Sequence, residues 1–455
     1  MAQAIVSWTT LVLGVFGVLF AWCALKSRHG TIDKLSMWYL GFALPGSELS
    51  TLLATLGVVF AAAAWALDAQ AGTVGQIGLV LHALAVIGLL VAIWLARGTG
   101  GVIDGALRQA LGHDYLQEIA PERRALLHPR LAPLRWWTPF SYRRPEVEWI
   151  RAIPYVENAH AQQKLDLMVP RTPAAGPRPV LLNIHGGGWM IGNRGTQAMP
   201  LQMHMAANGW LVVDADYRLS PAARMPDHIV DVKRAIAWTR AHAAEHGGDP
   251  RFIAITGGSA GGHLVALAGL SANEASLQPG FEQADTSVQV VVPYYGKFDV
   301  LGEARPDPTM DEFMGRSIFP GPRAEHEALW RAMQPTTHLQ RLGKDAAPPF
   351  FVLHGTNDVL IPLDEARWFA QRLRQDYAGE SVYVELPHAN HGFDVFNSLR
   401  ADLTVEMMQR YLELQYTRWC RRQGLLPTPA LAPSPAAAAA TAAAAATPAA
   451  AARLA

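Results

Sequence analysis

One short segment has the residue types and spacing for nucleophilic catalysis by a serine. Gly257-Gly258-Ser259-Ala260-Gly261 matches the pattern G-x-S-x-G. This pattern places the serine on a sharp turn between a strand and a helix, with its hydroxyl exposed. Glycines two residues before and after the serine let the strand and helix approach without Cβ clashes. We therefore expect Ser259 to be a nucleophile, with a purely structural glycine-rich turn as the alternative.

A second glycine-rich segment could stabilise negative charge. His185-Gly186-Gly187-Gly188-Trp189 directly follows a strand-length apolar run. Successive glycines allow backbone N–H groups to face an oxyanion, and the N–H of Ala260, just after the serine, would add a donor. A phosphate-binding loop is the alternative, but no G-K-[ST] or G-x-G-x-x-G pattern follows. The segment is expected to form an oxyanion hole.

Two further segments supply an acid and a base. Asp358 follows the apolar run 350–353, and His391 follows the run 382–386. Serine needs an adjacent base to become a nucleophile, and a carboxylate would orient and stabilise the imidazole. The chain order Ser, Asp, His is the α/β-hydrolase order. We prefer Asp358 and His391 over the rivals, which are His388, Asp364 and Asp394.

These four segments need a scaffold that brings strand ends together. Strand-length apolar runs alternate with stretches of helical periodicity. The expected strands cover 179–184, 210–215, 252–256, 288–292, 350–353 and 382–386. Such alternation predicts a mostly parallel sheet with helices on both faces. Reactive residues then gather at the carboxyl ends of the strands.

The middle of the chain resembles an α/β-hydrolase of the hormone-sensitive-lipase-like esterase group. The resemblance covers roughly residues 150–420 and rests on six segments in the order of that group: HGGGW (185–189), DYRLSP (216–221), GGDP (247–250), GGSAGG (257–262), HGTNDVLIP (354–362) and HGF (391–393). It implies Ser259 as nucleophile, Asp358 as acid and His391 as base. It also implies an oxyanion hole from the N–H groups of Gly187, Gly188 and Ala260, with His185 ordering the loop.

The resemblance implies a serine esterase or lipase that works through an acyl-enzyme. An amidase or deformylase with the same triad, and an inert membrane scaffold or transport protein, are the alternatives. The group often has an acidic residue before the serine and a Glu after its YRLxP block; Gly258 and Ala222 stand there. These departures leave the acyl chain and the alcohol open. This chemistry requires neither a metal nor a cofactor, and we expect none.

The first hundred residues are expected to form a membrane anchor. Only six of the first 96 residues are charged. Uncharged runs cover 4–25, 49–67 and 77–96, and about 20 apolar residues suffice to span a bilayer. The run 35–44 is too short, is expected to stop at Pro45-Gly46, and is interpreted as interfacial or re-entrant. A cleaved signal peptide is the alternative for the first run, which lacks a basic start.

Charge near these runs predicts an orientation. The first loop and the stretch after the third run carry positive residues: Lys26, Arg28, Lys34, Arg97, Arg108, Arg123 and Arg124. Positive residues stay cytoplasmic. Three spans therefore predict an integral membrane protein, in a bacterial inner membrane, with its catalytic domain on the cytoplasmic side. A chain that begins near Arg97 is expected to keep activity on short esters.

The remaining segments complete the expected organisation. Residues 101–150 form a connector that could partly cap the active site, 151–425 form the catalytic domain, and 426–455 form a disordered Ala/Pro-rich tail. Residues 296–343 are either an insertion that shapes the acyl pocket or a surface excursion. With 38 basic and 38 acidic residues, the chain is not expected to bind nucleic acid. Its partners are a small-molecule or lipid ester and a membrane, and the oligomeric state is open.

Overall fold

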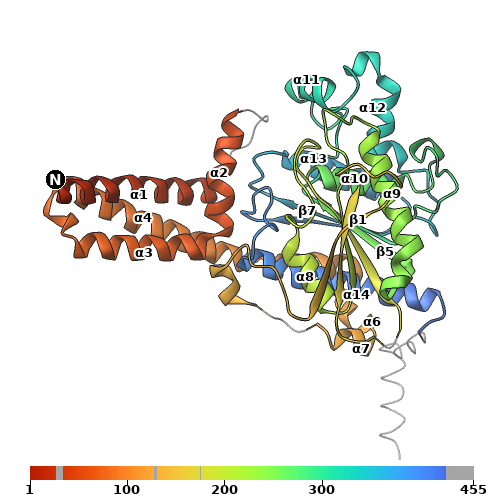
Figure 1. The fold of residues 1–455 in the computed structure, drawn as a ribbon, viewed down its shortest axis with the longest axis horizontal. Helices are drawn as coiled ribbons and strands as arrows, with labels where there is room; N and C mark the ends of the chain where they lie inside the picture. The colour runs from red at the N-terminus through yellow and green to blue at the C-terminus, as the bar shows by residue number, and fades with distance from the viewer. Residues whose placement is uncertain (27–33, 128–130, 175, 427–455) are drawn as a thin grey trace, which may run out of the picture.

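An apolar helical segment extends from a larger α/β domain (Figure 1). The computed structural model describes residues 1–26, 34–127, 131–174 and 176–426, so the expected tail from residue 427 onward lies outside the described residues. Four helices form the segment: α1 (Ala2–Leu25), α2 (Lys34–Glu48), α3 (Ser50–Ala66) and α4 (Thr73–Ala96). The helices α1 and α4 pack closely because glycines face the neighbouring backbone. A Cβ atom on Gly78 would lie 2.6 Å from the backbone nitrogen of Leu11.

Within the described residues, two helices are long and apolar enough to cross a membrane. They are α1 and the continuous helix Thr73–Leu111, which joins α4 to α5 (Thr99–Leu111). The helices α2 and α3 meet at an angle of 88° and become a third candidate if they count as one span. The expected stop at Pro45 is wrong, because α2 continues through Pro45 to Glu48. A proline removes one helical hydrogen bond and here does not end the helix.

The α/β domain is built on one eight-stranded sheet, with the strand order β1-β2-β4-β3-β5-β6-β7-β8. The strand β2 pairs antiparallel with β1 and β4, and the other neighbours are parallel. The strands are β1 (Val147–Pro154), β2 (Lys164–Pro170), β3 (Arg178–Ile184), β4 (Leu211–Ala215), β5 (Gly248–Gly258), β6 (Val290–Tyr294), β7 (Phe350–Gly355) and β8 (Ser381–Leu386). The predicted parallel sheet is confirmed. The antiparallel strands β1 and β2 were not expected, and β1 begins before the expected domain start at residue 151.

Helices cover both faces of the sheet (Figure 1). They are α8 (Met199–Ala207) and α14 (Leu399–Arg422) on one face, and α9 (Asp227–His242), α10 (Ala260–Leu270) and α13 (Leu363–Asp376) on the other. The strand β3 shows why: Val180 and Leu182 pack in the core with Ile229 of α9, whereas Leu181 packs in the core with Met408 of α14. Successive side chains of a strand point to opposite faces. A parallel strand that is apolar on both faces therefore requires two helical layers.

The connector packs along α14. It contains α5, α6 (Tyr115–Glu118), α7 (Pro121–Arg124) and the short helix η2 (Pro133–Trp137). Arg123 pairs with Glu413 on α14 at 2.6 Å, and the Trp136 indole N–H donates to Asp402 on α14 at 2.9 Å. The connector thus joins the apolar helices to one face of the α/β domain.

The segment 296–343 carries α11 (Pro308–Ser317) and α12 (Glu327–Met333). Its large apolar residues Phe319, Trp330 and Met333 are fully buried in the main core, and the rings of Phe319 and Trp330 stack with centroids 4.0 Å apart. A plain surface excursion would not bury such side chains. The segment is an integral part of the core.

Candidate active site

Ser259 lies on a strained turn between β5 and α10. Its backbone has φ 58° and ψ −120°, a conformation that residues other than glycine rarely adopt. Its N–H donates to the Tyr294 carbonyl at 3.0 Å, and its side chain is partly exposed. A Cβ atom on Gly261 would lie 2.2 Å from the Ile184 carbonyl oxygen, and one on Gly257 would lie 2.5 Å from it. The two glycines are therefore required where this turn meets the end of β3.

The glycine-rich loop after β3 lies directly against this turn. A Cβ atom on Gly186 would lie 3.0 Å from the Cβ of Ser259. Gly187 and Gly188 have φ angles of +117° and +60°, which glycine adopts readily. Within the described part of the chain, the N–H groups of Gly187, Gly188 and Ala260 donate to no protein acceptor. The three N–H groups predicted to bind an oxyanion therefore have no competing acceptor among the described residues.

His185 holds this loop from inside the core. Its ring is buried and stacks on Tyr217, with centroids 4.5 Å apart. Burial lowers the pKa of His185 and outweighs the hydrogen bond to Gly186 and the charge of Asp216. The ring is therefore neutral near pH 7. Its Nδ1 lies 2.8 Å from the Gly186 carbonyl oxygen, so that an N–H there would fix the first glycine of the loop.

The loops after β7 and β8 bring Asp358 and His391 together. The Nδ1 atom of His391 lies 2.8 Å from the Oδ2 atom of Asp358. The other carboxylate oxygen accepts from the N–H groups of Leu360 and Ile361, each at 2.8 Å. Burial alone would raise the pKa of Asp358, but the charge and hydrogen bond of His391 outweigh it and lower this pKa. Asp358 is therefore ionised and holds the imidazole by Nδ1.

The rival acids and base have other partners. Asp364 is in the first turn of α13, 3.7 Å from Arg367. Asp394 accepts a hydrogen bond from the Tyr295 hydroxyl. His388 is held by its backbone, which donates to the Thr356 hydroxyl at 2.9 Å. Of these candidates, only Asp358 and His391 are joined by a hydrogen bond in the described residues.

Tyr295 links the serine turn to the histidine loop and was not identified from the sequence. It directly follows β6, and its ring centroid lies 4.5 Å from that of His391. Its hydroxyl occupies the space beside Gly258, where a Cβ atom would lie 2.8 Å away. The tyrosine thus fills the space that a side chain at position 258 would need. The sequence signal, two tyrosines at a strand end, is the same as that of ordinary core aromatics.

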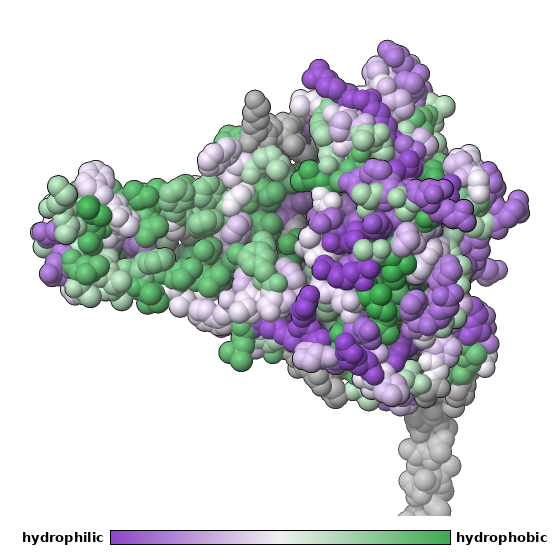
Figure 2. Space-filling view, in the orientation of Figure 1, coloured by the Kyte–Doolittle hydropathy of each residue, from purple (hydrophilic) through white to green (hydrophobic). Residues whose placement is uncertain are grey.

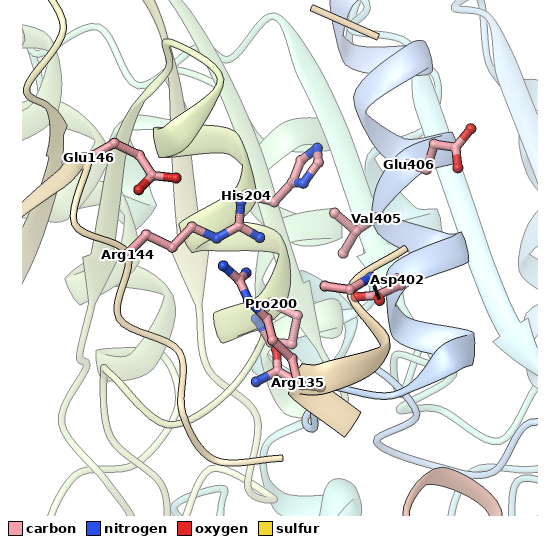
Figure 3. Close-up of a pocket in the computed structure, with 10 residues that line it drawn as sticks. Arg135, Arg144, Glu146, Pro200, His204, Asp402, Val405 and Glu406 are labelled. Atoms are coloured by element: carbon pink, nitrogen blue, oxygen red, sulfur yellow. Dashed lines mark hydrogen bonds between the residues drawn. The ribbon is translucent and has the colours of Figure 1, made fainter. Parts of the chain in front are cut away.

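A separate polar cavity of about 130 Å³ lies between the connector and α14 (Figure 3). Arg135 and Arg144 point into it from the connector, and Asp402 lines it from α14. None of the candidate catalytic residues lines this cavity. It belongs to the attachment of the connector and is distinct from the candidate active site.

Comparisons with known proteins identify the family of this chain. Residues 165–373 match the BD-FAE family. The chain is 38% identical to "Probable carboxylic ester hydrolase LipM" of Mycobacterium tuberculosis over 417 residues, which cover 89% of this chain and 92% of LipM. It is 38% identical to esterase LipQ of the same organism over 336 residues, 71% of this chain and 77% of LipQ. The crystal structure of esterase B from Lactobacillus rhamnosis has a similar fold, with a TM-score of 0.52 and 21% identity over 62% of this chain and 90% of that protein.

The mostly parallel eight-stranded sheet and the match to the BD-FAE family define an esterase of the α/β-hydrolase fold. The chain belongs to the family of carboxylic ester hydrolases that includes LipM and LipQ. The predicted enzyme class, carboxylic ester hydrolase, is thereby confirmed. The similarity to LipM leaves only about 50 residues of this chain unmatched (11% of 455). It therefore extends into the N-terminal helices.

Proposed function

We propose that this carboxylic ester hydrolase works through Ser259, His391 and Asp358. The hydrogen bond between His391 Nδ1 and Asp358 Oδ2, at the sheet edge where Ser259 lies, carries this assignment. With Nδ1–H held by Asp358, the Nε2 atom of His391 is free to accept the serine proton. Ser259 Oγ then attacks the ester carbonyl, and Asp358 stabilises the imidazolium. The imidazolium protonates the leaving alcohol, and His391 later activates the water that releases the acid.

The oxyanion of each tetrahedral intermediate would bind to the N–H groups of Gly187, Gly188 and Ala260. These donors are unused by the described protein atoms. Ala260 is also the first residue of α10, where the helix dipole favours negative charge. Loss of one such donor typically lowers kcat by about 10²–10³.

Esters are preferred over amides as the substrate class because the relatives are named esterases and carboxylic ester hydrolases. An amidase or deformylase would need the same residues. A series of p-nitrophenyl esters of increasing acyl length, with an anilide control, distinguishes the two on the purified protein. Ser259→Ala should abolish hydrolysis while its thermal unfolding stays unchanged, because both residues meet the same backbone strain at φ 58°. Activity retained by this variant would contradict the assignment.

We also propose that the N-terminal helices anchor the enzyme in a membrane through three spans, α1, α3 and α4, with α2 lying at the membrane interface beside the catalytic domain. Their outward residues are apolar and exposed, among them Val12, Phe16, Val58, Val80 and Ile87, and together they form an apolar surface (Figure 2). Soluble proteins rarely expose so large a patch. A helix of 24 residues such as α1 is about 36 Å long and spans the hydrocarbon core.

Exposed tryptophans support two membrane interfaces. Trp8 and Trp65 lie near the distal ends of α1 and α3, and Trp22 and Trp94 lie near the ends of α1 and α4 that adjoin the catalytic domain. Tryptophan favours the boundary between lipid and water. Because positive loop residues stay cytoplasmic, we propose that the catalytic domain lies on the cytoplasmic side of a bacterial inner membrane.

This anchor is tested by fractionation and by topology reporters. The full-length enzyme should remain in the membrane fraction after carbonate extraction and should dissolve in detergent. A reporter fused after residue 426 should show a cytoplasmic location. Release by carbonate would contradict the anchor, and a periplasmic signal would reverse the orientation.

A further inference from the structure

The bend between α2 and α3 places a buried carboxylate against the catalytic domain. The Glu48 side chain is fully buried. Its Oε2 atom accepts from the Ser398 hydroxyl at 2.9 Å, and its Oε1 atom accepts from Arg400 Nε at 3.0 Å. A buried carboxylate is costly unless it is paired and hydrogen-bonded. Glu48, one of the few charged residues in the apolar segment, thus has both oxygens committed to the start of α14.

Arg400 connects Glu48 to the loop that carries His391. Arg400 is 2% exposed. Its Nη1 atom donates to the Pro387 carbonyl at 3.0 Å, and its Nη2 atom donates to the His388 carbonyl at 3.3 Å. These two carbonyls lie just before His391 in the chain. The guanidinium is a rigid fork, so its orientation against Glu48 determines where it holds this loop.

The helix α2 also contacts the other side of His391. A Cβ atom on Gly392 would lie 3.4 Å from a methyl carbon of Leu44. Gly392 has φ +78°, which allows the chain to turn beneath α2. The loop is therefore held before His391 by Arg400 and after it by Leu44, and both contacts depend on the N-terminal segment.

We propose that Glu48 is a positioning residue for His391, so that the N-terminal segment belongs to the catalytic unit as well as to the anchor. This inference rests on the proposed role of His391. Without the Glu48 carboxylate, Arg400 would be a buried charge lacking its partner and would shift to find another. The loop that it holds would shift with it. A misplacement of about 1 Å can lower the rate about 100-fold.

The proposal changes one expectation from the sequence. A chain that begins near Arg97 lacks both Glu48 and Leu44 while it retains Arg400. Such a chain should have reduced turnover even on short, water-soluble esters. The sequence alone led us to expect that it would keep this activity.

The Arg123–Glu413 pair offers a matched control. It also joins the N-terminal half of the chain to α14 by a buried carboxylate, with Arg123 Nε 2.6 Å from Glu413 Oε2. Glu413 follows Arg400 by 13 residues of one helix, or about 20 Å, and has no contact with the His391 loop in the described residues. Loss of either carboxylate should lower stability. Only the loss of Glu48 should displace His391 and lower kcat.

The test compares Glu48→Gln with Glu413→Gln in the full-length protein in detergent micelles. The readouts are kcat and KM on a short p-nitrophenyl ester, together with the thermal unfolding midpoint. Glu48→Gln should lower kcat by roughly 10- to 100-fold with KM nearly unchanged. Glu413→Gln should lower the midpoint but keep kcat. A wild-type kcat in Glu48→Gln, or an equal loss of kcat in both variants, would overturn the proposal.

Two further variants keep the test decisive. If Glu48→Gln does not fold, Arg400→Lys replaces it, because a lysine keeps the charge opposite Glu48 but cannot hold both loop carbonyls. It should show the same loss of kcat, and a normal kcat would overturn the proposal. His391→Ala is measured in parallel and should be inactive. An active His391→Ala would contradict the proposed function itself, whereas an inactive one beside a fully active Glu48→Gln contradicts only the role of Glu48.

Discussion

The ring of Tyr295 packs on the ring of His391, with centroids 4.5 Å apart. The same tyrosine lies against Gly258, and its hydroxyl donates a hydrogen bond to the Asp394 carboxylate. Tyr295 therefore connects the backbone before the candidate nucleophile with the candidate base. A side chain at position 258 would compete with it for space.

Gly258→Ala should lower kcat without unfolding the protein. The new Cβ atom would lie 2.8 Å from the Tyr295 hydroxyl and 2.9 Å from its ring, so Tyr295 must shift against His391. We expect a loss of about tenfold or more in kcat, since small displacements of catalytic groups are costly. Gly105→Ala on α5 is the control, because its Cβ atom meets nothing within 4 Å. Equal kcat values for Gly258→Ala and Gly105→Ala would contradict this prediction, because they would show that Tyr295 can move without displacing His391.

Asp358→Asn should lower kcat by about 10⁴. An amide cannot stabilise the imidazolium and does not select the imidazole tautomer with its proton on Nδ1. The comparison variant is Asp364→Asn, which changes an exposed rival acid six residues further along the chain. It should keep normal ester hydrolysis. A strong loss of kcat in Asp364→Asn, with little loss in Asp358→Asn, would mean that Asp364 rather than Asp358 is the acid of the triad.

Lys233 should make stability depend on pH in the alkaline range. Burial lowers the pKa of Lys233 to about 7 from an ordinary value of 10.5. Between these values the unfolded chain binds a proton that the folded chain does not. Stability therefore rises with pH from about 7 to about 10.5. Thermal unfolding midpoints measured across this range should show the rise in the wild type.

Lys233→Met should flatten this pH dependence, because methionine does not titrate. Lys344→Met, at an exposed position, should leave the wild-type slope in place. Lys233 is removed from the candidate active site and donates to the Ser271 carbonyl at 2.6 Å. A slope that is identical in the wild type and in Lys233→Met would mean that Lys233 remains charged when buried.

The catalytic segments could be predicted from sequence because their signals are local. A strand-length apolar run followed by a glycine-rich turn indicates where a strand ends, and parallel strands place such ends at one edge. Ser259, Asp358 and His391 were proposed on this basis, and the structure brings the last two within 2.8 Å. The antiparallel strands β1 and β2 were missed. Their runs are interrupted by charged residues such as Glu148 and Asp166. The buried Asp166 carboxylate is satisfied by hydrogen bonds from Trp149, Ala152 and Arg194, which the sequence does not reveal.

Only the tertiary structure shows which parts of the catalytic domain the N-terminal helices contact. Composition and run length mark them as candidates for a membrane, since both properties are local to the chain. The contact between Glu48 and Arg400 joins residues 352 positions apart, and no local pattern encodes which helix end packs against which loop. The same holds for Tyr295, whose role depends on Gly258 and His391 from other strand ends. Long-range packing determines these contacts, because each partner is specified by the arrangement of whole elements around the sheet.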